Sequence, residues 1–236
     1  MGRSSLRVNL SSDKFPVRRS FRILHLADFH VSEDVPLSLI EEAIVLGIKK
    51  QPDICFITGD FITTKLSDED FSRYAEILGK LTEKIPKTFA CLGNHDGGKW
   101  ARSTNGYDTT KKMEGLLKKS KVVLLQNEQR VVYVKGQPLT LVGLGDIWAQ
   151  QCFPDKCLRK SKPNRSTHEP PTIVLSHNPD SKTFLGEHDW HLMLCGHTHG
   201  GQINITKFMP KIMNFLYKGK LYNNNNLTGL WECNGM

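Results

Sequence analysis

Five apolar segments of this chain each end in a short cluster of Asp, His, Asn and Gly, and this repetition restricts the fold more than any other feature. The first three segments span residues 21–27, 53–58 and 87–92. Between them, residues 36–49 and 68–84 carry apolar side chains mostly at helical spacing. Strands that are apolar along nearly their whole length are typical of a parallel sheet covered on both faces. The order strand, helix, strand, helix, strand therefore predicts an α/β fold with helices on both faces of a parallel sheet.

The second half of the chain continues this pattern with one helix and four strand-like segments. The helix is expected near residues 109–120, and the strands at 129–134, 138–143, 172–176 and 190–195. Residues 159–169 are rich in charged residues and predict an exposed loop. No internal repeat or long linker interrupts the pattern, so we expect a basic N-terminal arm over residues 1–20 and one domain over residues 21–236.

The positive charge of the chain is concentrated in three segments. The chain has 32 Lys and Arg against 24 Asp and Glu, a formal net charge of +8. Residues 1–22, 111–121 and 156–165 together carry 16 basic and two acidic residues, which leaves 16 basic and 22 acidic residues elsewhere. This division argues against a nonspecific nucleic-acid-binding protein, which would be basic throughout. The three segments are either solvated surface or contacts for phosphate-bearing ligands or an anionic membrane.

The cysteines and the hydropathy favour a reduced, cytoplasmic chain. Cys55, Cys91 and Cys195 lie in apolar runs, where a free thiol packs as a small hydrophobic group. Cys152 and Cys157 lack the two further nearby ligands that a zinc site would need. No stretch reaches the roughly 18 consecutive apolar residues of a membrane-spanning helix. We therefore expect membrane contact, if it occurs, to be peripheral and on the cytoplasmic face of the inner membrane.

The clusters at the strand ends predict a metal site. Ligands of open α/β sheets bind at the carboxyl ends of the strands. We expect seven side chains to meet there: Asp28, His30, Asp60, Asn94, His177, His197 and His199. Carboxylate, imidazole and amide ligands suit Mn²⁺, Zn²⁺ or iron better than Ca²⁺, which prefers oxygen ligands alone. Seven ligands are enough for two divalent ions about 3.5–4 Å apart. Four other histidines lie away from these ends and are expected to be structural: His25, His168, His188 and His191.

Taken together, the motifs at the strand ends resemble those of the calcineurin-like metallophosphoesterase superfamily. The matching blocks are Asp28-x-His30, Gly59-Asp60, Gly93-Asn94-His95-Asp96, Ser176-His177 and Gly196-His197-x-His199, which span roughly residues 21–205. The resemblance implies a β-sandwich core flanked by helices and an enzyme that hydrolyses phosphoesters with two divalent metal ions, Mn²⁺ being favoured.

The same resemblance implies a role for each ligand. Asp60 would bridge the two metals. One metal would also bind Asp28, His30 and His199, and the other Asn94, His177 and His197. His95 would act as general acid or orient the phosphate, with Asp96 as its partner.

The block Gly196-His-Thr-His-Gly-Gly-Gln-Ile203 is similar to a narrower branch of the superfamily. That branch includes bacterial membrane-associated phosphodiesterases and the alternative UDP-2,3-diacylglucosamine pyrophosphatases of lipid A synthesis. It implies cleavage of a phosphodiester or pyrophosphate bond in a nucleotide-linked lipid by a metal-activated hydroxide. Two alternatives remain open: a broad-specificity phosphomonoesterase or protein phosphatase of the same superfamily, and a non-catalytic scaffold or nucleic-acid-binding module. Branch members continue with one or two strands after the region equivalent to residues 217–222, so we expect truncated C-terminal strands here.

Overall fold

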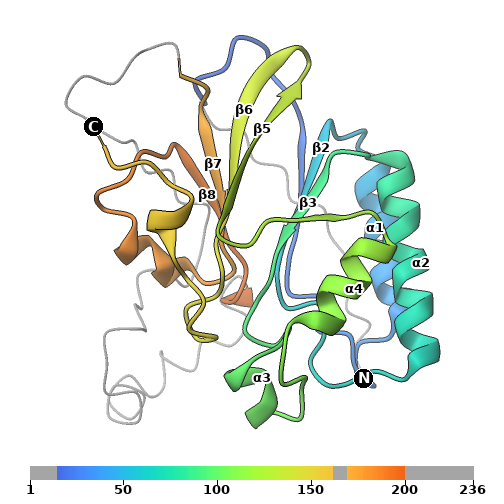
Figure 1. The fold of residues 1–236 in the computed structure, drawn as a ribbon. Helices are drawn as coiled ribbons and strands as arrows, with labels where there is room; N and C mark the ends of the chain where they lie inside the picture. The colour runs from blue at the N-terminus through green and yellow to red at the C-terminus, as the bar shows by residue number, and fades with distance from the viewer. Residues whose placement is uncertain (1–14, 162–168, 200–236) are drawn as a thin grey trace, which may run out of the picture.

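The computed structural model describes residues 15–161 and 169–199 and shows two four-stranded sheets packed face to face (Figure 1). The first sheet is parallel, with the order β1-β2-β3-β4. Its strands are β1 (Ile23–Leu26), β2 (Ile54–Thr58), β3 (Thr88–Cys91) and β4 (Val123–Leu124). The helices of this half are α1 (Leu37–Ile48), α2 (Asp68–Lys84), the short α3 (Lys99–Ser103) and α4 (Lys111–Lys119). Helices α1, α2 and α4 lie against the outer face of this sheet, and α3 follows the carboxyl end of β3 (Figure 1).

The second sheet has the order β5-β6-β7-β8 and is mixed. Strands β5 (Glu128–Val134) and β6 (Gln137–Gly143) form an antiparallel hairpin. Strands β7 (Thr172–Leu175) and β8 (Leu192–Leu194) then add in parallel to β6. The 3₁₀ helices η1 (Pro154–Lys156) and η2 (Pro179–Phe184) belong to the same half of the chain. Strands β6, β7 and β8 run in the same direction, so their carboxyl ends share one edge.

Alternating side chains of β2 show how the two halves are joined. Cys55 and Ile57 pack into the apolar cluster formed with the helices. Ile54 and Phe56 pack into a second cluster with Leu141 and other residues of the second sheet. The prediction that helices cover both faces of the parallel sheet is therefore wrong, because the second face is covered by a sheet. A continuous apolar run shows only that both faces are buried, not which element buries them. The β-sandwich flanked by helices is confirmed.

The chain immediately before β1 packs on the sandwich. Phe15 and Val17 contact the apolar cluster between the sheets. The side-chain oxygen of Gln137 accepts hydrogen bonds from the backbone N–H groups of Arg18 and Arg19, at 2.9 and 3.1 Å. Residues 15–20 of the expected basic arm are thus attached to the domain. Residues 1–14, the expected loop segment 162–168 and the expected C-terminal truncation within 200–236 lie outside the described residues.

Neither a membrane span nor a disulfide occurs in the part of the chain that the structure describes. None of its helices is long and apolar enough to cross a membrane. The five described cysteines are free, and three of them (Cys55, Cys91 and Cys157) are buried.

Candidate metal centre

All seven expected ligands lie at the carboxyl ends of strands, where the two sheets meet. Each follows a strand directly or within a few residues: Asp28 and His30 follow β1, Asp60 follows β2, Asn94 follows β3, His177 follows β7, and His197 and His199 follow β8. Five of them have left-handed backbone conformations, with φ between 47° and 69°: Asp28, His30, Asp60, His197 and His199. Such conformations are uncommon for residues other than glycine. They turn the chain sharply, so that consecutive loops direct side chains to one place.

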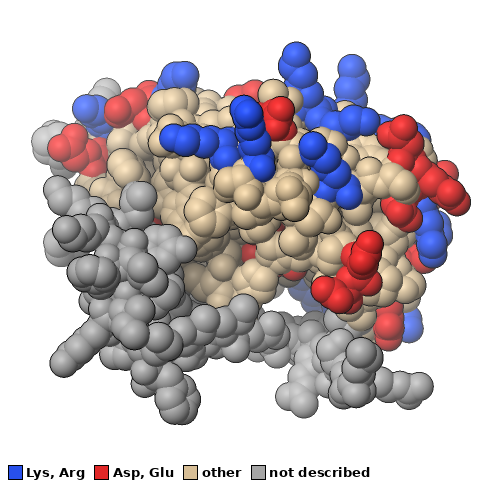
Figure 2. All heavy atoms as spheres, turned by 90° about the horizontal axis from the view of Figure 1, so that it is seen from below, with Lys and Arg blue, Asp and Glu red and all other residues tan. Residues whose placement is uncertain are grey.

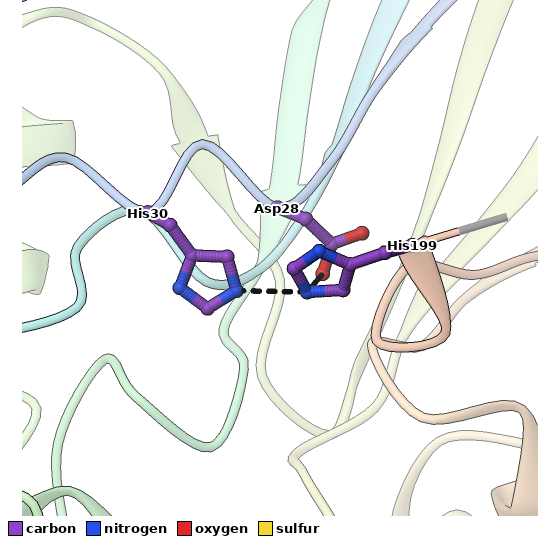
Figure 3. Close-up of side chains that lie close together, drawn as sticks. All are labelled: Asp28, His30 and His199. Carbon is purple, nitrogen blue, oxygen red and sulfur yellow. Dashed lines mark hydrogen bonds and ion pairs between the residues drawn. The ribbon is translucent and has the colours of Figure 1, made fainter. Parts of the chain in front are cut away.

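Three of these side chains form an open cluster, defined as Asp28, His30 and His199 (Figure 3). Nε2 of His199 lies 3.0 Å from Nε2 of His30 and 3.8 Å from Oδ1 of Asp28. The two imidazole rings are stacked with their centroids 4.8 Å apart. The side chain of His199 is 33% exposed, so this cluster can be reached from solvent.

The other four form a buried cluster, defined as Asp60, Asn94, His177 and His197. Oδ1 of Asn94 lies 3.1 Å from Nε2 of His177 and 3.0 Å from Nδ1 of His197. The two imidazole nitrogens are themselves 3.1 Å apart. His177 is fully buried, and Asp60 and Asn94 are each 2% exposed. Three potential ligand atoms therefore face one another, two of them on buried side chains and the third on the partly exposed His197.

Asp60 joins the two clusters. Its Oδ2 atom lies 3.3 Å from Nε2 of His30 and 3.2 Å from Nε2 of His177. Its Oδ1 atom accepts a hydrogen bond from the backbone N–H of His95 at 2.9 Å. A Cβ on Gly93 would overlap with Oδ1 and the backbone nitrogen of Asp60, so glycine at this position allows the carboxylate to approach. One carboxylate oxygen is thus in contact with ligand nitrogens from both clusters.

The neighbours of His177 determine which of its nitrogens carries the proton. Nδ1 lies 2.9 Å from the carbonyl oxygen of Thr58, which can only accept a hydrogen bond. We therefore assign the proton to Nδ1, which leaves a lone pair on Nε2. That lone pair faces Oδ1 of Asn94 and Oδ2 of Asp60, which are both acceptors. Such a contact is repulsive unless a cation or a second proton lies between the atoms.

The same reasoning applies to His30 in the open cluster. The hydroxyl of Thr63 donates to the carbonyl oxygen of His30 at 3.2 Å and faces Nδ1 of the same residue at 3.2 Å. Because the single hydroxyl proton is used on the carbonyl, we assign Nδ1 of His30 as the donor to Thr63. Its Nε2 then presents a lone pair to the nearby oxygen of Asp60. A partner on the outer nitrogen commonly fixes the tautomer of a metal-binding histidine in this way.

The charges of the site favour a bound cation. Burial lowers the pKa of His30 to about 4 and that of His197 to about 3, so both imidazoles are neutral near neutral pH. Burial also acts to lower the pKa of His177, but the carboxylates of Asp60 and Asp28 outweigh it and raise this pKa to about 10. A site that holds a proton so tightly attracts positive charge. Convergent carboxylate, imidazole and amide donors fit a pair of divalent ions.

Asp96 holds backbone groups of the loops that carry the site. Its Oδ2 atom accepts hydrogen bonds from the backbone N–H groups of Asp60 and Gly93, and Oδ1 accepts one from Phe61. The imidazole of His95 instead has Nδ1 3.4 Å from the carbonyl oxygen of Thr63. The expected partnership between Asp96 and the His95 side chain stays a prediction, and in the structure the buried side chain of Asp96 fixes the loop that carries Asp60. Burial raises the pKa of Asp96 to about 8.

Some residues of the site were not found from the sequence. Thr58 and Thr63 orient histidines of the two clusters, the first through its carbonyl group and the second through its hydroxyl. Trp148 packs edge-on against the ring of His197, with centroids 4.6 Å apart. Asp146, three residues after Gly143 at the end of β6, is 2% exposed. Its position after a strand was the one available signal, but it belongs to none of the blocks that carried the resemblance.

The histidines expected to be structural make contacts of that kind. Nε2 of His25 lies 2.8 Å from the hydroxyl of Thr58, and Nε2 of His188 lies 3.1 Å from Oδ1 of Asp155. Nδ1 of His191 accepts a hydrogen bond from the backbone of β7. His168 lies outside the described residues.

Comparison with known proteins gives a family and several relatives. Residues 21–201 match the calcineurin-like phosphoesterase family. The chain is 42% identical to phosphodiesterase YaeI of Escherichia coli over 185 residues, which cover 78% of this chain and 63% of that protein. It is 27% identical over 244 residues to UDP-2,3-diacylglucosamine pyrophosphatase LpxG of Chlamydia trachomatis. That match covers 86% of this chain and 71% of LpxG. It is also 27% identical over 219 residues to the uncharacterized metallophosphoesterase YkoQ of Bacillus subtilis, covering 92% and 74%. The matched region thus spans less than two thirds of the YaeI chain.

Proposed function

The chain belongs to the calcineurin-like phosphoesterase family, and we propose that it is a dimetal-dependent phosphodiesterase or pyrophosphatase. The observation that carries this proposal is the position of Asp60, whose Oδ2 atom faces imidazole nitrogens of both clusters at 3.2 and 3.3 Å. A bridging carboxylate between two sets of ligands is what a pair of neighbouring cations requires. The identity to a phosphodiesterase supports the reaction class.

The ligand assignment follows the two clusters. Asp28, His30 and His199 would hold one divalent ion, Asn94, His177 and His197 the other, and Asp60 both. We propose Mn²⁺ as the resident ion, with Zn²⁺ or iron also compatible with these donors. When bound, such ions stabilise negative charge on a phosphoryl group and activate water for hydrolysis.

His95 is the residue that we propose to act on the leaving oxygen. Its backbone N–H is fixed by Oδ1 of Asp60, and its ring lies edge-on to that of His30 with centroids 5.1 Å apart. It is less buried than the neighbouring Asn94 and Asp96. From this position the imidazole can donate a proton to the oxygen that departs or can orient the phosphate. Asp96 contributes by holding the backbone of Asp60 and Phe61 in place.

For the substrate we propose a nucleotide-linked lipid such as UDP-2,3-diacylglucosamine. The support is the similarity to LpxG of Chlamydia trachomatis and the presence of exposed cationic segments. Figure 2, which views the carboxyl-terminal edge of the strands, shows Lys and Arg side chains gathered along one side of that face. Lys118, Lys119 and Lys121 are exposed at the end of α4 and just after it. We propose that such segments hold the enzyme on the cytoplasmic face of an anionic membrane.

A substrate panel tests the proposed reaction. The Mn²⁺-loaded protein is assayed with UDP-2,3-diacylglucosamine, bis-p-nitrophenyl phosphate and p-nitrophenyl phosphate. We expect turnover of the first two. Hydrolysis of the monoester alone would contradict the proposal and favour a phosphomonoesterase. No Mn²⁺-dependent hydrolysis, together with salt-sensitive binding of DNA or RNA, would favour a binding module.

Replacing His95 tests the catalytic assignment. His95→Ala should keep both metals and lose roughly 100-fold or more in kcat, the scale of general acid–base catalysis. Metal content measured by mass spectrometry separates this loss from a loss of ligands. His188→Ala is the matched control, since His188 pairs with Asp155 away from both clusters. Unchanged turnover in His95→Ala would remove this residue from the mechanism.

Vesicle binding tests the proposed membrane contact. Exchanging Lys118, Lys119 and Lys121 for Gln should weaken co-sedimentation with anionic vesicles, since each charge contributes about 1 kcal/mol near such a surface. Lys49→Gln with Lys50→Gln, just after the C-terminal end of α1 and outside the three basic segments, is the control. Equal binding to anionic and neutral vesicles would contradict an electrostatic attachment.

A further inference from the structure

Two tryptophans extend the metal centre on the side of the buried cluster. The ring of Trp148 lies edge-on to His197, with centroids 4.6 Å apart and an interplanar angle of 81°. The ring of Trp100 lies 4.6 Å from that of Trp148, tilted by 60°. Both tryptophans are partly exposed. An aromatic pair therefore begins directly beside a proposed metal ligand and continues to the surface.

The backbone holds Trp148 firmly in this place. Oδ1 of the buried Asp146 accepts hydrogen bonds from the backbone N–H groups of Trp148 and Ala149, at 2.7 and 2.9 Å. The N–H of Gln151 donates to the carbonyl oxygen of Asp146 at 2.9 Å, which closes the turn. Asp146 is thus a positioning residue for the ring.

Trp100 approaches from a different segment. It lies on α3, which starts after Gly98, a residue with φ of 101°. Its Nε1 atom is buried and has no hydrogen-bond partner in the described residues. The ring is thus held by packing rather than by a hydrogen bond of its indole.

Polar and charged groups lie near the pair, beside the methyl group of Ala149. Lys99 and Arg102 are exposed on α3. The side-chain nitrogen of Gln151 lies 3.9 Å from the place that a Cβ on Gly98 would occupy. The amide of Gln126 donates to that of Gln151 at 2.9 Å. An acyl chain would need a continuous apolar groove, whereas flat rings bordered by amides and cations suit a planar polar ring carrying phosphate.

We propose that Trp148 and Trp100 form an aromatic subsite that stacks on the nucleobase of the substrate while its phosphate lies at the metal centre. This proposal rests on the proposed function and adds to it that the nucleobase is the part of the substrate that sets specificity. Trp148 makes the contact nearer the phosphate, because it touches His197, and Trp100 extends the surface outward.

Equilibrium binding of two matched ligands tests this subsite. UMP and ribose 5-phosphate carry the same phosphorylated sugar, and only UMP has a base. Binding to the Mn²⁺-loaded full chain is followed by tryptophan fluorescence for UMP and by calorimetry for both ligands. We expect UMP to bind roughly 5- to 150-fold more tightly, the range for stacking one base on an aromatic side chain.

Three variants separate the stacking role from a structural one. Trp148→Leu should bring the affinities of the two ligands to within about twofold of each other, and Trp148→Phe should restore part of the difference. Trp190→Phe is the matched control, because Trp190 packs against the cluster on the far side of the second sheet. Trp190→Phe should keep both the preference for UMP over ribose 5-phosphate and the change in tryptophan fluorescence on UMP binding. Mn²⁺ affinity, measured in the same samples, should not change in Trp148→Leu.

Several results would overturn the subsite. These are equal binding of UMP and ribose 5-phosphate by the unaltered chain, a preference that survives in Trp148→Leu, and a loss in that variant that follows lost Mn²⁺ affinity. The two proposals fail separately. A base preference without diester or pyrophosphate hydrolysis would remove the proposed reaction only, and hydrolysis without a base preference would remove the subsite only.

Discussion

The two clusters of the metal centre use similar side chains in different surroundings. In the buried cluster, His177 is fully buried and Asp60 and Asn94 are each 2% exposed. In the open cluster, the side chains of Asp28, His30 and His199 are 12%, 16% and 33% exposed. Charges interact more strongly where water is excluded, so the buried cluster should hold a cation more tightly. The open cluster is the one through which an ion or a substrate can exchange.

Removing the carboxylate that the two clusters share should abolish the difference between them. Asp60→Asn should empty both clusters and lower kcat by roughly 10³-fold or more, the scale of losing a central electrostatic group. Metal stoichiometry and turnover are measured together. Asp108→Asn, at a side chain that is 67% exposed, is the control for the same chemical change. One metal retained at full occupancy would show that Asp60 serves a single cluster.

Replacing one histidine in each cluster tests whether the two differ in affinity. His177→Gln and His199→Gln should both weaken Mn²⁺ binding, by roughly 100-fold and 10-fold respectively, because water reaches the fully buried position of His177 less readily than that of His199 to replace the lost ligand. We expect excess Mn²⁺ to restore turnover in His199→Gln only. Calorimetric titration and activity against Mn²⁺ concentration give both quantities. Equal recovery of turnover in the two variants with excess Mn²⁺ would contradict the expectation that the buried cluster binds Mn²⁺ more tightly.

The two threonines allow a finer test, because one acts through its side chain and the other through its backbone. Thr63→Val removes the hydroxyl that fixes His30 and should weaken Mn²⁺ binding at the open cluster about 10-fold. Thr58→Val keeps the carbonyl that fixes His177, so Mn²⁺ binding at the buried cluster should be unchanged. If Thr58→Val weakened binding as much as Thr63→Val, the backbone contact would not be the determinant.

An effect on stability rather than on metal binding is expected from pH, through His25, whose Nε2 lies 2.8 Å from the hydroxyl of Thr58. Burial lowers the pKa of His25 from 6.5 to about 4 in the folded protein. The unfolded chain therefore takes up this proton first, and the stability contributed by neutral His25 is present above pH 6.5 and is lost as the pH falls toward 4. The contribution of His25 to the free energy of unfolding of the metal-free protein should fall by about 2 kcal/mol by pH 5. Urea unfolding of the unaltered chain and of His25→Gln checks this, since the variant should lack that component.

The convergence of the seven proposed ligands at one edge could be predicted because polar clusters at strand ends leave a clear pattern in the sequence. Asp28 and Asp60, for example, follow strands that are recognisable from their apolar residues alone. The second sheet could not be foreseen in the same way, because Ile54 and Phe56 are apolar whichever element covers them. The hydrogen bonds of Asp96 to the backbone of Asp60 and Phe61 could not be foreseen either, because residues that meet in space need not be neighbours along the chain. The role of Thr58 lies in its backbone, which no side-chain pattern reports.

Trp148 shows a different limit of the sequence. It lies in the loop after β6, among residues that resemble no metal-binding motif. Its importance comes from the contact with His197, 49 positions further along the chain, which the topology of the second sheet creates. A single tryptophan in a loop carries no such information before the fold is known.

The left-handed backbone at five of the ligands has a consequence for how a cation enters. Each such residue costs roughly 1–2 kcal/mol relative to an ordinary conformation, and the packed sandwich beneath imposes that cost during folding. The loops that carry the proposed ligand atoms are consequently ordered by the fold itself, which reduces the entropic cost of binding an ion. Part of the free energy of folding thus contributes to the affinity for a divalent ion. The protein should therefore capture a divalent ion rapidly, with little change in its backbone.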